Sequence, residues 1–131
     1  MQIHQSAEDY LETILMLTQR MGRVRSIDVV NELGYTKASV SIAMKKLREN
    51  GYIAVDGEGN LTLLEPGREI AERIYSRHQL LTHFFVQLGV DEEVAAEDAC
   101  KAEHILSEQT LKKIREYALL HDAEDSVQKS E

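Results

Sequence analysis

The sequence predicts a mainly α-helical protein with one small β-hairpin. Apolar residues recur at helical spacing over most of the chain, and glycines stand where these periodic stretches stop. Only two short β-prone runs, on either side of the turn-rich segment 56–60, break the pattern. With 43% hydrophobic and 29% charged residues in a chain of 131, the composition is that of a folded globular protein.

Three helices are predicted in the first half of the chain, each starting at a capping residue and stopping at a glycine. In order, they are 7–21 after Ser6 and before Gly22, 27–33 after Ser26 and before Gly34, and 36–50 from Thr36 to Gly51. In the third, Val40, Ala43, Met44 and Leu47 follow the i, i+3, i+4, i+7 spacing of one buried face. The tight turn between the second and third helices predicts a helix-turn-helix.

A β-hairpin is predicted directly after these helices. The runs 52–55 and 61–64 are β-prone, and the segment 56–60 between them is rich in turn residues. A helix-turn-helix followed by a hairpin is a winged helix. We therefore predict a winged helix-turn-helix domain over residues 1–65.

The second half of the chain predicts helices only. A long helix runs from Pro66 to Gly89, and a second begins near Asp91 and continues over small residues to Leu106. Ser107 caps a last helix, for which the predicted inward residues are Leu111, Ile114, Ala118 and Leu119. We predict an all-helical module over 66–121, for dimerisation and metal binding as argued below, and a flexible tail over 122–131.

The predicted third helix has the properties of a DNA-reading helix. Opposite its apolar face lie small, hydroxyl and basic side chains: Thr36, Lys37, Ala38, Ser39, Ser41, Ile42, Lys45 and Lys46. The net charge of −8 is concentrated in the C-terminal third, whereas Arg25 and the third helix form a locally basic region. The alternative is a winged helix that binds protein. Because Asp56 and Glu58 are acidic, we expect the hairpin tip to contribute little to phosphate contact.

A second group of residues has the spacing of metal ligands. On one helix, Cys100, Glu103 and His104 at i, i+3 and i+4 would project from one side, and a thiolate, a carboxylate and an imidazole suit a divalent transition metal. Asp9 and Glu12 add two carboxylates three residues apart. Each weaker candidate also has a structural explanation: Asp9 can complete the cap of the first helix, His78 can be a core histidine, and Cys100 can be a small packed side chain.

These segments together resemble the diphtheria toxin repressor family, in particular its short branch of manganese transport regulators. The resemblance lies in four segments in order: Glu8-Asp9-Tyr10-Leu11-Glu12, Arg77-His78-Gln79-Leu80-Leu81, Gly89-Val90-Asp91-Glu92-Glu93, and Ala102-Glu103-His104-Ile105-Leu106-Ser107. It implies that a metal-loaded homodimer binds operator DNA and represses metal-uptake genes. It also implies that the SH3-like domain of the longer members is absent. A cytoplasmic protein is expected on other grounds, because the N-terminus lacks a basic region followed by an apolar stretch.

The resemblance implies metal ligands at five positions: Asp9, Glu12, His78, Glu103 and His104. The chain departs from the manganese branch at Cys100, where that branch has a glutamate, and from the iron-responsive branch at Asp9, where that branch has methionine. We therefore expect Mn(II) or Fe(II) as the bound ion, with Co(II) or Zn(II) binding in vitro. Thr82 and Ala96 occupy the positions that would complete a second, ancillary site, so we expect that site to be missing.

Two other functions fit parts of the pattern. The chain can be a winged-helix DNA-binding dimer that is not gated by metal, or a metalloenzyme whose metal activates water. We expect no enzymatic activity, because the candidate ligands lie on packed helices without a glycine-rich substrate loop or a spare acid-base group. We also expect no membrane partner, because no apolar run approaches the roughly 20 residues that a membrane-spanning helix needs.

Overall fold

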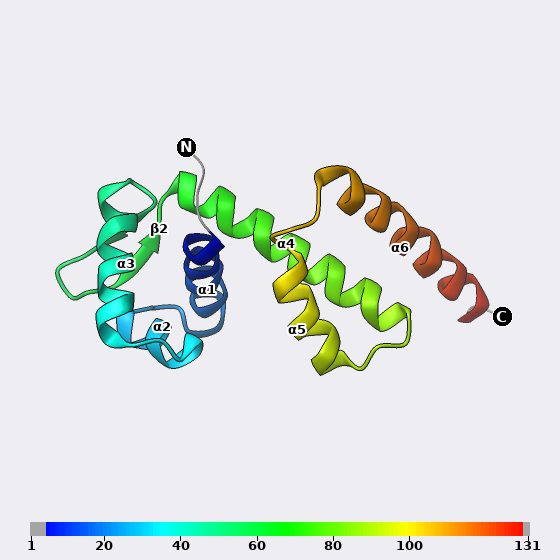
Figure 1. Cartoon of the computed structure of the whole chain (residues 1–131), viewed down its shortest axis with the longest axis horizontal. Coiled ribbons are helices and arrows are strands. Elements are labelled where there is room, and N and C mark those ends of the chain that lie inside the picture. Colours follow the sequence, from blue (N-terminus) through cyan, green and yellow to red (C-terminus); the bar gives the residue numbers. More distant parts are fainter. Residues whose placement is uncertain (1–4, 130–131) are drawn as a thin grey trace. The chain divides into compact units, whose positions relative to one another are not determined.

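The computed structural model describes the backbone of residues 5–129 and the side chains of 6–123. Within that range it confirms the predicted mainly α-helical fold with a single hairpin (Figure 1). The elements are α1 (Gln5–Met21), α2 (Ser26–Leu33), α3 (Lys37–Glu49), β1 (Ile53–Val55), β2 (Leu61–Leu63), α4 (Glu65–Gln87), α5 (Glu92–Ala102) and α6 (Glu108–Lys129). No helix of the described residues is long and apolar enough to cross a membrane.

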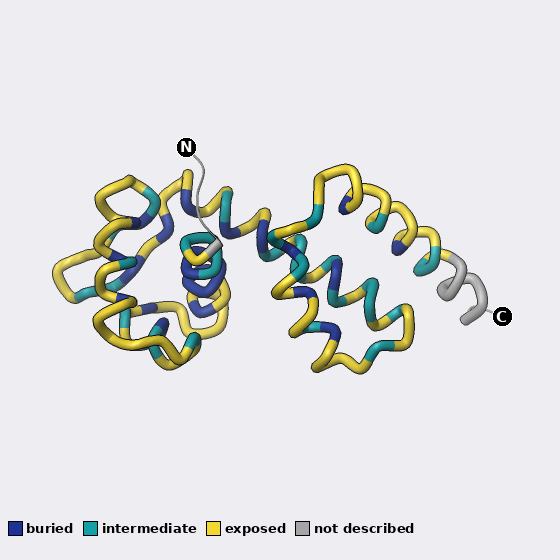
Figure 2. Tube along the Cα trace, in the orientation of Figure 1, coloured by how far each residue is buried: buried dark blue, intermediate teal, exposed yellow. Residues whose placement is uncertain are grey.

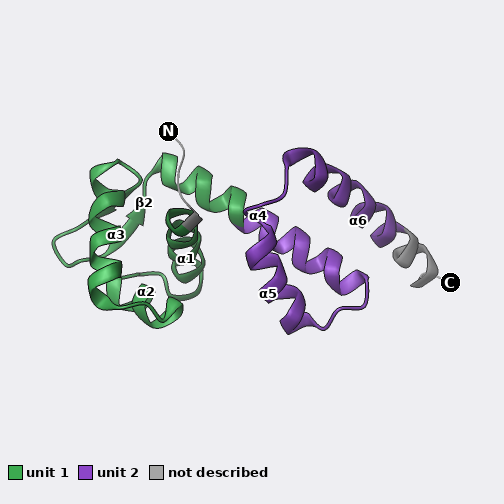
Figure 3. Cartoon of the chain, viewed as in Figure 1, with its two compact units in different colours: residues 1–74 green, residues 75–131 purple. Residues whose placement is uncertain are grey.

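The chain divides into two compact units, Met1–Ile74 and Tyr75–Glu131 (Figure 3). The boundary falls inside α4, rather than between residues 65 and 66 as the sequence predicts. The reason is that the first turns of α4 belong to the N-terminal unit, where Ala71 and Ile74 are fully buried. The continuous helix α4 therefore contributes buried residues to the cores of both units.

The N-terminal unit is built around the helix-turn-helix. Its core takes Leu11 and Ile14 from α1, Val29 from α2 and Val40 from α3 (Figure 2). Gly34 ends α2 in the left-handed conformation, with φ of 72°, and its N–H donates to the Val30 carbonyl. The predicted turn chemistry is confirmed at this position.

The caps of the first helices differ in part from the predicted ones. Thr36 caps α3, because its hydroxyl accepts from the Ser39 N–H at 3.1 Å, as predicted. Ser6 lies inside α1 instead of preceding it. Ser26 is already helical, and the residue before it, Arg25, takes the cap position with its N–H donating to the Asp28 carboxylate at 2.9 Å.

The hairpin pairs β1 with β2 in antiparallel register, with Ile53 opposite Leu63. At its tip the Asp56 carboxylate accepts from the N–H groups of Asn60 and Glu58 and from the Asn60 side-chain amide. These bonds, foremost those from Asn60, hold the pKa of Asp56 below its usual range. The acidic residue at this tip therefore closes the turn. The Arg25 guanidinium fixes the tip further by donating to the Glu58 carbonyl.

Gly67, near the start of α4, is a close-packed position that the sequence analysis did not identify. A Cβ atom here would lie 2.2 Å from the Tyr52 carbonyl oxygen, a backbone atom that already accepts from the Leu64 N–H. Only a residue without a side chain fits where α4 packs against Tyr52, the residue that precedes β1. The hairpin and α4 therefore meet at a contact of backbone against backbone.

We expect Gly67→Ala to destabilise the protein by about 1–3 kcal/mol, the usual cost of forcing an extra carbon into a packed site. Gly57→Ala is the matched control, because a Cβ atom there meets nothing within 4 Å. Urea unfolding of both variants measures the difference in the free energy of unfolding. Equal stability of the two variants would contradict the contact.

The C-terminal unit is formed by the second half of α4, α5 and α6. Leu81, Ala99 and Leu111, one from each helix, form its buried core. Near the far end of α4, the ring of Phe84 meets that of Tyr117 on α6 edge-on, with centroids 5.9 Å apart. The unit is a small three-helix bundle with an aromatic contact outside its core.

One prediction for α6 is wrong. Leu119, predicted to face inward, is exposed, because it follows the buried Ala118 and one residue turns the side chain by roughly 100° around the helix. The helix continues to Lys129, and the flexibility of the segment 122–131 stays a prediction. It extends past His121 because Asp122 is held to α4: Gln87 Nε2 donates to Asp122 Oδ1 at 2.8 Å, and His83 Nε2 lies 2.9 Å from the same atom.

Candidate metal centre and DNA-reading helix

Helix α5 ends earlier than the sequence predicts, and this changes how the candidate metal ligands are presented. It stops at Ala102, and residues 103–106 form a turn closed by Ile105 and Leu106, whose N–H groups both donate to the Ala102 carbonyl. Glu103 keeps helical dihedrals, so the predicted i, i+3 relation to Cys100 is retained. His104 lies in the turn, so the three residues do not lie on one continuous helix as predicted.

Glu103 lies between two imidazoles. Its Oε2 is 3.2 Å from His78 Nδ1 on α4, and its Oε1 is 3.4 Å from His104 Nε2. Cys100 joins the first side, since ligand atoms of His78, Cys100 and Glu103 all lie within 4.8 Å of one another. The structure thus brings together four of the predicted metal ligands within the C-terminal unit, with Glu103 at the centre.

Burial makes this carboxylate unusual. Glu103 has an exposed fraction of 0%, and neither of its oxygens makes a hydrogen bond within the described part of the chain. Removing a carboxylate from water is costly unless positive charge or hydrogen bonds compensate it. A divalent cation supplies that charge, and the neighbouring nitrogen and sulfur atoms complete a ligand set for a transition metal. The residues present therefore fit a metal ion.

Cys100 and His78 differ from the structural alternatives considered for them. Cys100 is exposed, so it is not a small packed side chain. His78 is only partly buried, and it faces the Glu103 carboxylate rather than an apolar core. Asp9 and Glu12 lie on α1 in the N-terminal unit, Asp9 partly buried and Glu12 buried, and their role in metal binding stays a prediction.

Arg77 is a residue of this region that the ligand pattern alone did not single out. Its Nη1 donates to the Glu103 carbonyl oxygen at 3.2 Å, and its Nη2 forms an ion pair with Glu108 in the first turn of α6. The only sequence signal was its place beside His78. Arg77 therefore contacts both ends of the turn that carries Glu103 and His104.

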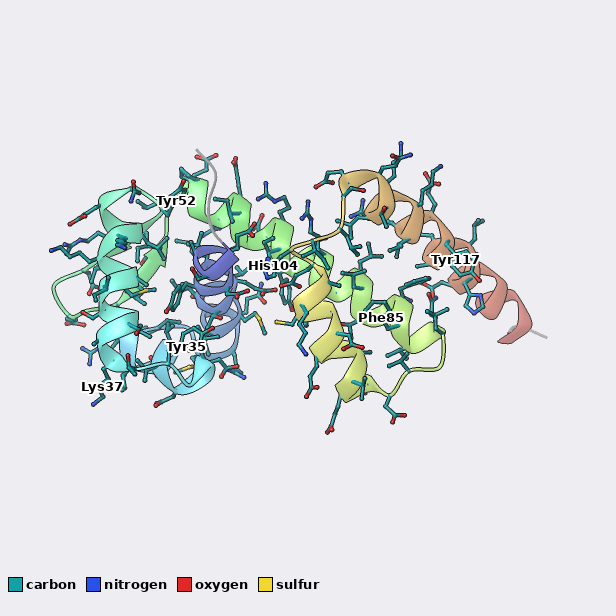
Figure 4. The ribbon with its side chains drawn as sticks, viewed as in Figure 1. Tyr35, Lys37, Tyr52, Phe85, His104 and Tyr117 are labelled. Carbon is teal, nitrogen blue, oxygen red and sulfur yellow. The ribbon has the colours of Figure 1, made fainter. Side chains whose placement is uncertain are left out.

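The outward face of α3 is open to solvent along its whole length. All eight predicted DNA-reading residues are exposed, and Lys37 at its amino-terminal end is labelled in Figure 4. Val40, Met44 and Leu47 are buried on the opposite face, as predicted. Arg48 is a further exposed basic residue, which with Ser41 and Lys45 lines a shallow hollow of 270 Å³. Arg25 is exposed as well, beside the turn of the hairpin.

Tyr10 on α1 and Tyr35, two residues before α3, are in contact in the same unit. Their rings meet edge-on, with centroids 5.9 Å apart and an angle of 74° between them. Burial raises the pKa of Tyr10, and the neighbouring Tyr35 raises it further. The Tyr10 phenol is therefore neutral near pH 7, and the two rings pack against each other next to the helix-turn-helix.

Comparison with known proteins gives a match to two family models that together span nearly the whole chain. The model described as iron dependent repressor, N-terminal DNA binding domain, matches residues 2–61. The model described as iron dependent repressor, metal binding and dimerisation domain, matches residues 64–122. The two matches follow each other in the order of the two functional regions described above.

Individual relatives agree with these models. An uncharacterized HTH-type transcriptional regulator from Methanocaldococcus jannaschii is 35% identical over 113 residues, which cover 85% of this chain and 90% of the relative. The HTH-type transcriptional regulator MntR from Lysinibacillus sphaericus is 32% identical over 127 residues, covering 96% and 91%. A solved manganese-dependent transcriptional repressor in complex with manganese superposes with a TM-score of 0.79 at 27% identity. The match covers 86% of this chain and 52% of the solved chain, so this chain spans about half of that protein.

Proposed function

Since the chain belongs to the iron-dependent repressor family, and is thus a metal-dependent transcriptional regulator rather than an enzyme, we propose that it represses metal-uptake genes as a metal-loaded homodimer. The observation that carries the proposal is the buried Glu103 carboxylate between His78 and His104, in a chain that also presents an exposed basic α3. One module supplies a metal site and the other a surface for DNA.

We assign the metal to His78, Cys100, Glu103 and His104, together with Asp9 and Glu12. The distances within the C-terminal unit support the first four, and the family resemblance supports the two carboxylates of α1. Mn(II) or Fe(II) is the proposed ion in the cell, and Co(II) or Zn(II) can replace it in vitro. The names of the related MntR regulators and of the iron-dependent family support this choice.

Operator DNA is the proposed partner of α3. Lys37, Lys45 and Lys46 supply charge for phosphates, and the small and hydroxyl side chains allow close approach to base edges. Ile42, which is exposed although it is apolar, suits contact with thymine methyl groups. The full proposed set is Arg25, Thr36, Lys37, Ala38, Ser39, Ser41, Ile42, Lys45 and Lys46. Because its target is the chromosome, we place the protein in the cytoplasm.

A second copy of the chain is the proposed partner of the C-terminal unit. Several large apolar side chains of this unit are exposed: Leu88, Val94, Ile105, Leu119 and Leu120. A contiguous patch of exposed apolar side chains marks a protein interface, and these residues are the candidates for such a patch. The family model over this region, which describes a dimerisation domain, supports the assignment. A dimer presents two copies of α3 to two half-sites of an operator.

Metal binding acts through a shift in population under this proposal. Without metal, the carboxylates of Asp9, Glu12 and Glu103 disfavour a single arrangement of the helices that carry them. A bound cation neutralises them and restrains α1, and with it the helix-turn-helix, in the form that fits DNA. The coupling is reciprocal: the free energy by which bound metal strengthens DNA binding equals the free energy by which bound DNA strengthens metal binding.

The experiment that tests this function is an operator titration with and without metal at fixed salt. We expect Mn(II), Fe(II) or Co(II) to raise DNA affinity by about 5- to 150-fold, the usual range of coupling between two sites. Lys37→Ala and Lys45→Ala should weaken DNA binding and reduce its salt dependence, whereas Lys112→Ala on α6 is the matched control. Equal affinity with and without metal would favour an ungated winged-helix protein.

A further inference from the structure

We infer that Arg77 is a positioning residue of the metal site: it holds the turn that carries Glu103 and His104 without itself binding the ion. This inference rests on the proposed function, because it concerns the same site. Arg77 comes from α4, directly beside the proposed ligand His78. One turn of α4 thus supplies both a ligand and the group that fixes two other ligands.

The need for such a group follows from the end of α5. A helix leaves its last four carbonyl groups without partners inside the helix, and Glu103 is the C-cap residue of α5. The Glu103 carbonyl accepts from Arg77 Nη1 at 3.2 Å. A cation at this end of a helix is also favoured by the helix dipole. Arg77 thereby satisfies the backbone of the residue whose carboxylate lies at the centre of the site.

The other side of the turn is held by the same guanidinium. Nη2 of Arg77 pairs with Glu108 Oε1, one residue after Ser107, whose hydroxyl caps α6 by accepting from the Thr110 N–H at 3.2 Å. Between the two contacts lie residues 103–107, which include His104. The guanidinium presents its donors in a fixed planar fork, whereas lysine is a point charge on a flexible stem, so lysine is not an equivalent replacement.

Electrostatics alone predicts the opposite effect of Arg77 on the metal. A positive charge near the site repels a divalent cation, and removal of that charge would raise metal affinity. Glu108 compensates part of this charge, and its own exposure weakens the pair through solvent screening. If Arg77 acts by positioning, its removal lowers metal affinity instead. The sign of the change therefore distinguishes the two roles.

The test is Co(II) binding to the full chain, followed by absorption spectroscopy and by titration calorimetry. We expect Arg77→Gln to lower Co(II) affinity by about 10- to 100-fold, as is usual when a partner that orients a metal ligand is lost. In the metal-free protein, amide hydrogen exchange of Ile105 and Leu106 should become faster. Arg73→Gln is the matched control, one helical turn earlier on α4 and paired with Glu8, and it should change neither quantity.

Two further variants keep the inference testable if Arg77→Gln does not fold. Arg77→Lys retains the charge but not both contacts, and Glu108→Gln retains the carbonyl contact but not the ion pair. Each should lower Co(II) affinity by less than Arg77→Gln would. If every folded variant at Arg77 and Glu108 bound Co(II) as tightly as the wild type or more tightly, the positioning role would be overturned. The proposed metal site itself would not be affected by that result. Absence of Co(II) binding to the wild-type protein would overturn the proposed function, and the inference with it.

Discussion

Replacement of Glu103 with glutamine is expected to lower the affinity of the protein for Co(II) or Mn(II) by more than about 100-fold, beyond the loss typical of residues that only orient a ligand. The side chain keeps its shape but loses its charge. Because the carboxylate lies 3.2 Å from one imidazole and 3.4 Å from the other, its loss affects both sides of the site. Titration calorimetry with each metal measures the change.

The stability of the metal-free variant gives a second, independent result. The Glu103 carboxylate is fully buried, and burial of a charge costs free energy that a neutral isostere does not require. We therefore expect the melting temperature of Glu103→Gln without metal to equal or exceed that of the wild type. Added metal should raise the melting temperature of the wild type only, because a ligand stabilises the state that binds it.

Glu97→Gln is the control for this prediction, because Glu97 is an exposed acidic residue on α5, the helix at whose C-terminal end Glu103 lies. It should bind metal and respond to it like the wild type. A Glu103→Gln variant that is strongly destabilised without metal would mean that the carboxylate serves the fold through its two imidazole neighbours. One that keeps wild-type metal affinity would remove Glu103 from the ligand set.

The parts of the fold that the sequence predicted well depend on local chemistry. The inward face of α3 follows from helical periodicity, and Gly34 marks the end of α2 because few other residues adopt its left-handed conformation. Thr36 caps α3 through a bond to a residue only three positions away. Interactions within one helical turn join residues that are close in the sequence, so the spacing of residue types is enough to predict them.

The parts that the sequence did not predict depend on contacts between distant segments. The periodic residues of α5 suggest a helix to Leu106, but the Ala102 carbonyl accepts from two turn residues and Arg77 on α4 takes the next carbonyl. Likewise, the need for glycine at position 67 comes from Tyr52, which precedes the hairpin. The spacing of residues within one segment cannot predict contacts with another segment.

The proposed metal site combines both kinds of information. The i, i+3 spacing of Cys100 and Glu103 is local, and it keeps their ligand atoms close together because Glu103 retains helical dihedrals. The contact of His78 with the same carboxylate joins α4 to the end of α5. In the sequence, the only sign of this role was a histidine on the apolar stripe of a helix, which is a weak signal. The central role of Glu103 between two imidazoles became evident only from the structure.

Cys100→Glu is expected to weaken the preference of the site for Fe(II), Co(II) and Zn(II) over Mn(II), because it replaces a soft donor with a hard one. In the wild type, the thiolate favours Fe(II), Co(II) and Zn(II) relative to Mn(II). The variant should lose about 10-fold or more in Zn(II) and Co(II) affinity and should bind Mn(II) at least as tightly as the wild type. Calorimetric titration of each metal at one pH measures both changes.

The exposure of Cys100 makes this substitution a clean test of ligand chemistry. A longer side chain at an exposed position displaces no packed neighbour, so stability without metal should be nearly unchanged. Cys100→Ser separates loss of the thiolate from gain of the carboxylate: it should weaken Co(II) binding and abolish the thiolate-to-cobalt absorption band without improving Mn(II) binding. If both variants kept the wild-type affinities for all of these metals, the sulfur would lie outside the coordination sphere. His78 and Glu103 would then bind the ion without it, and the metal preference would have to come from nitrogen and oxygen donors alone.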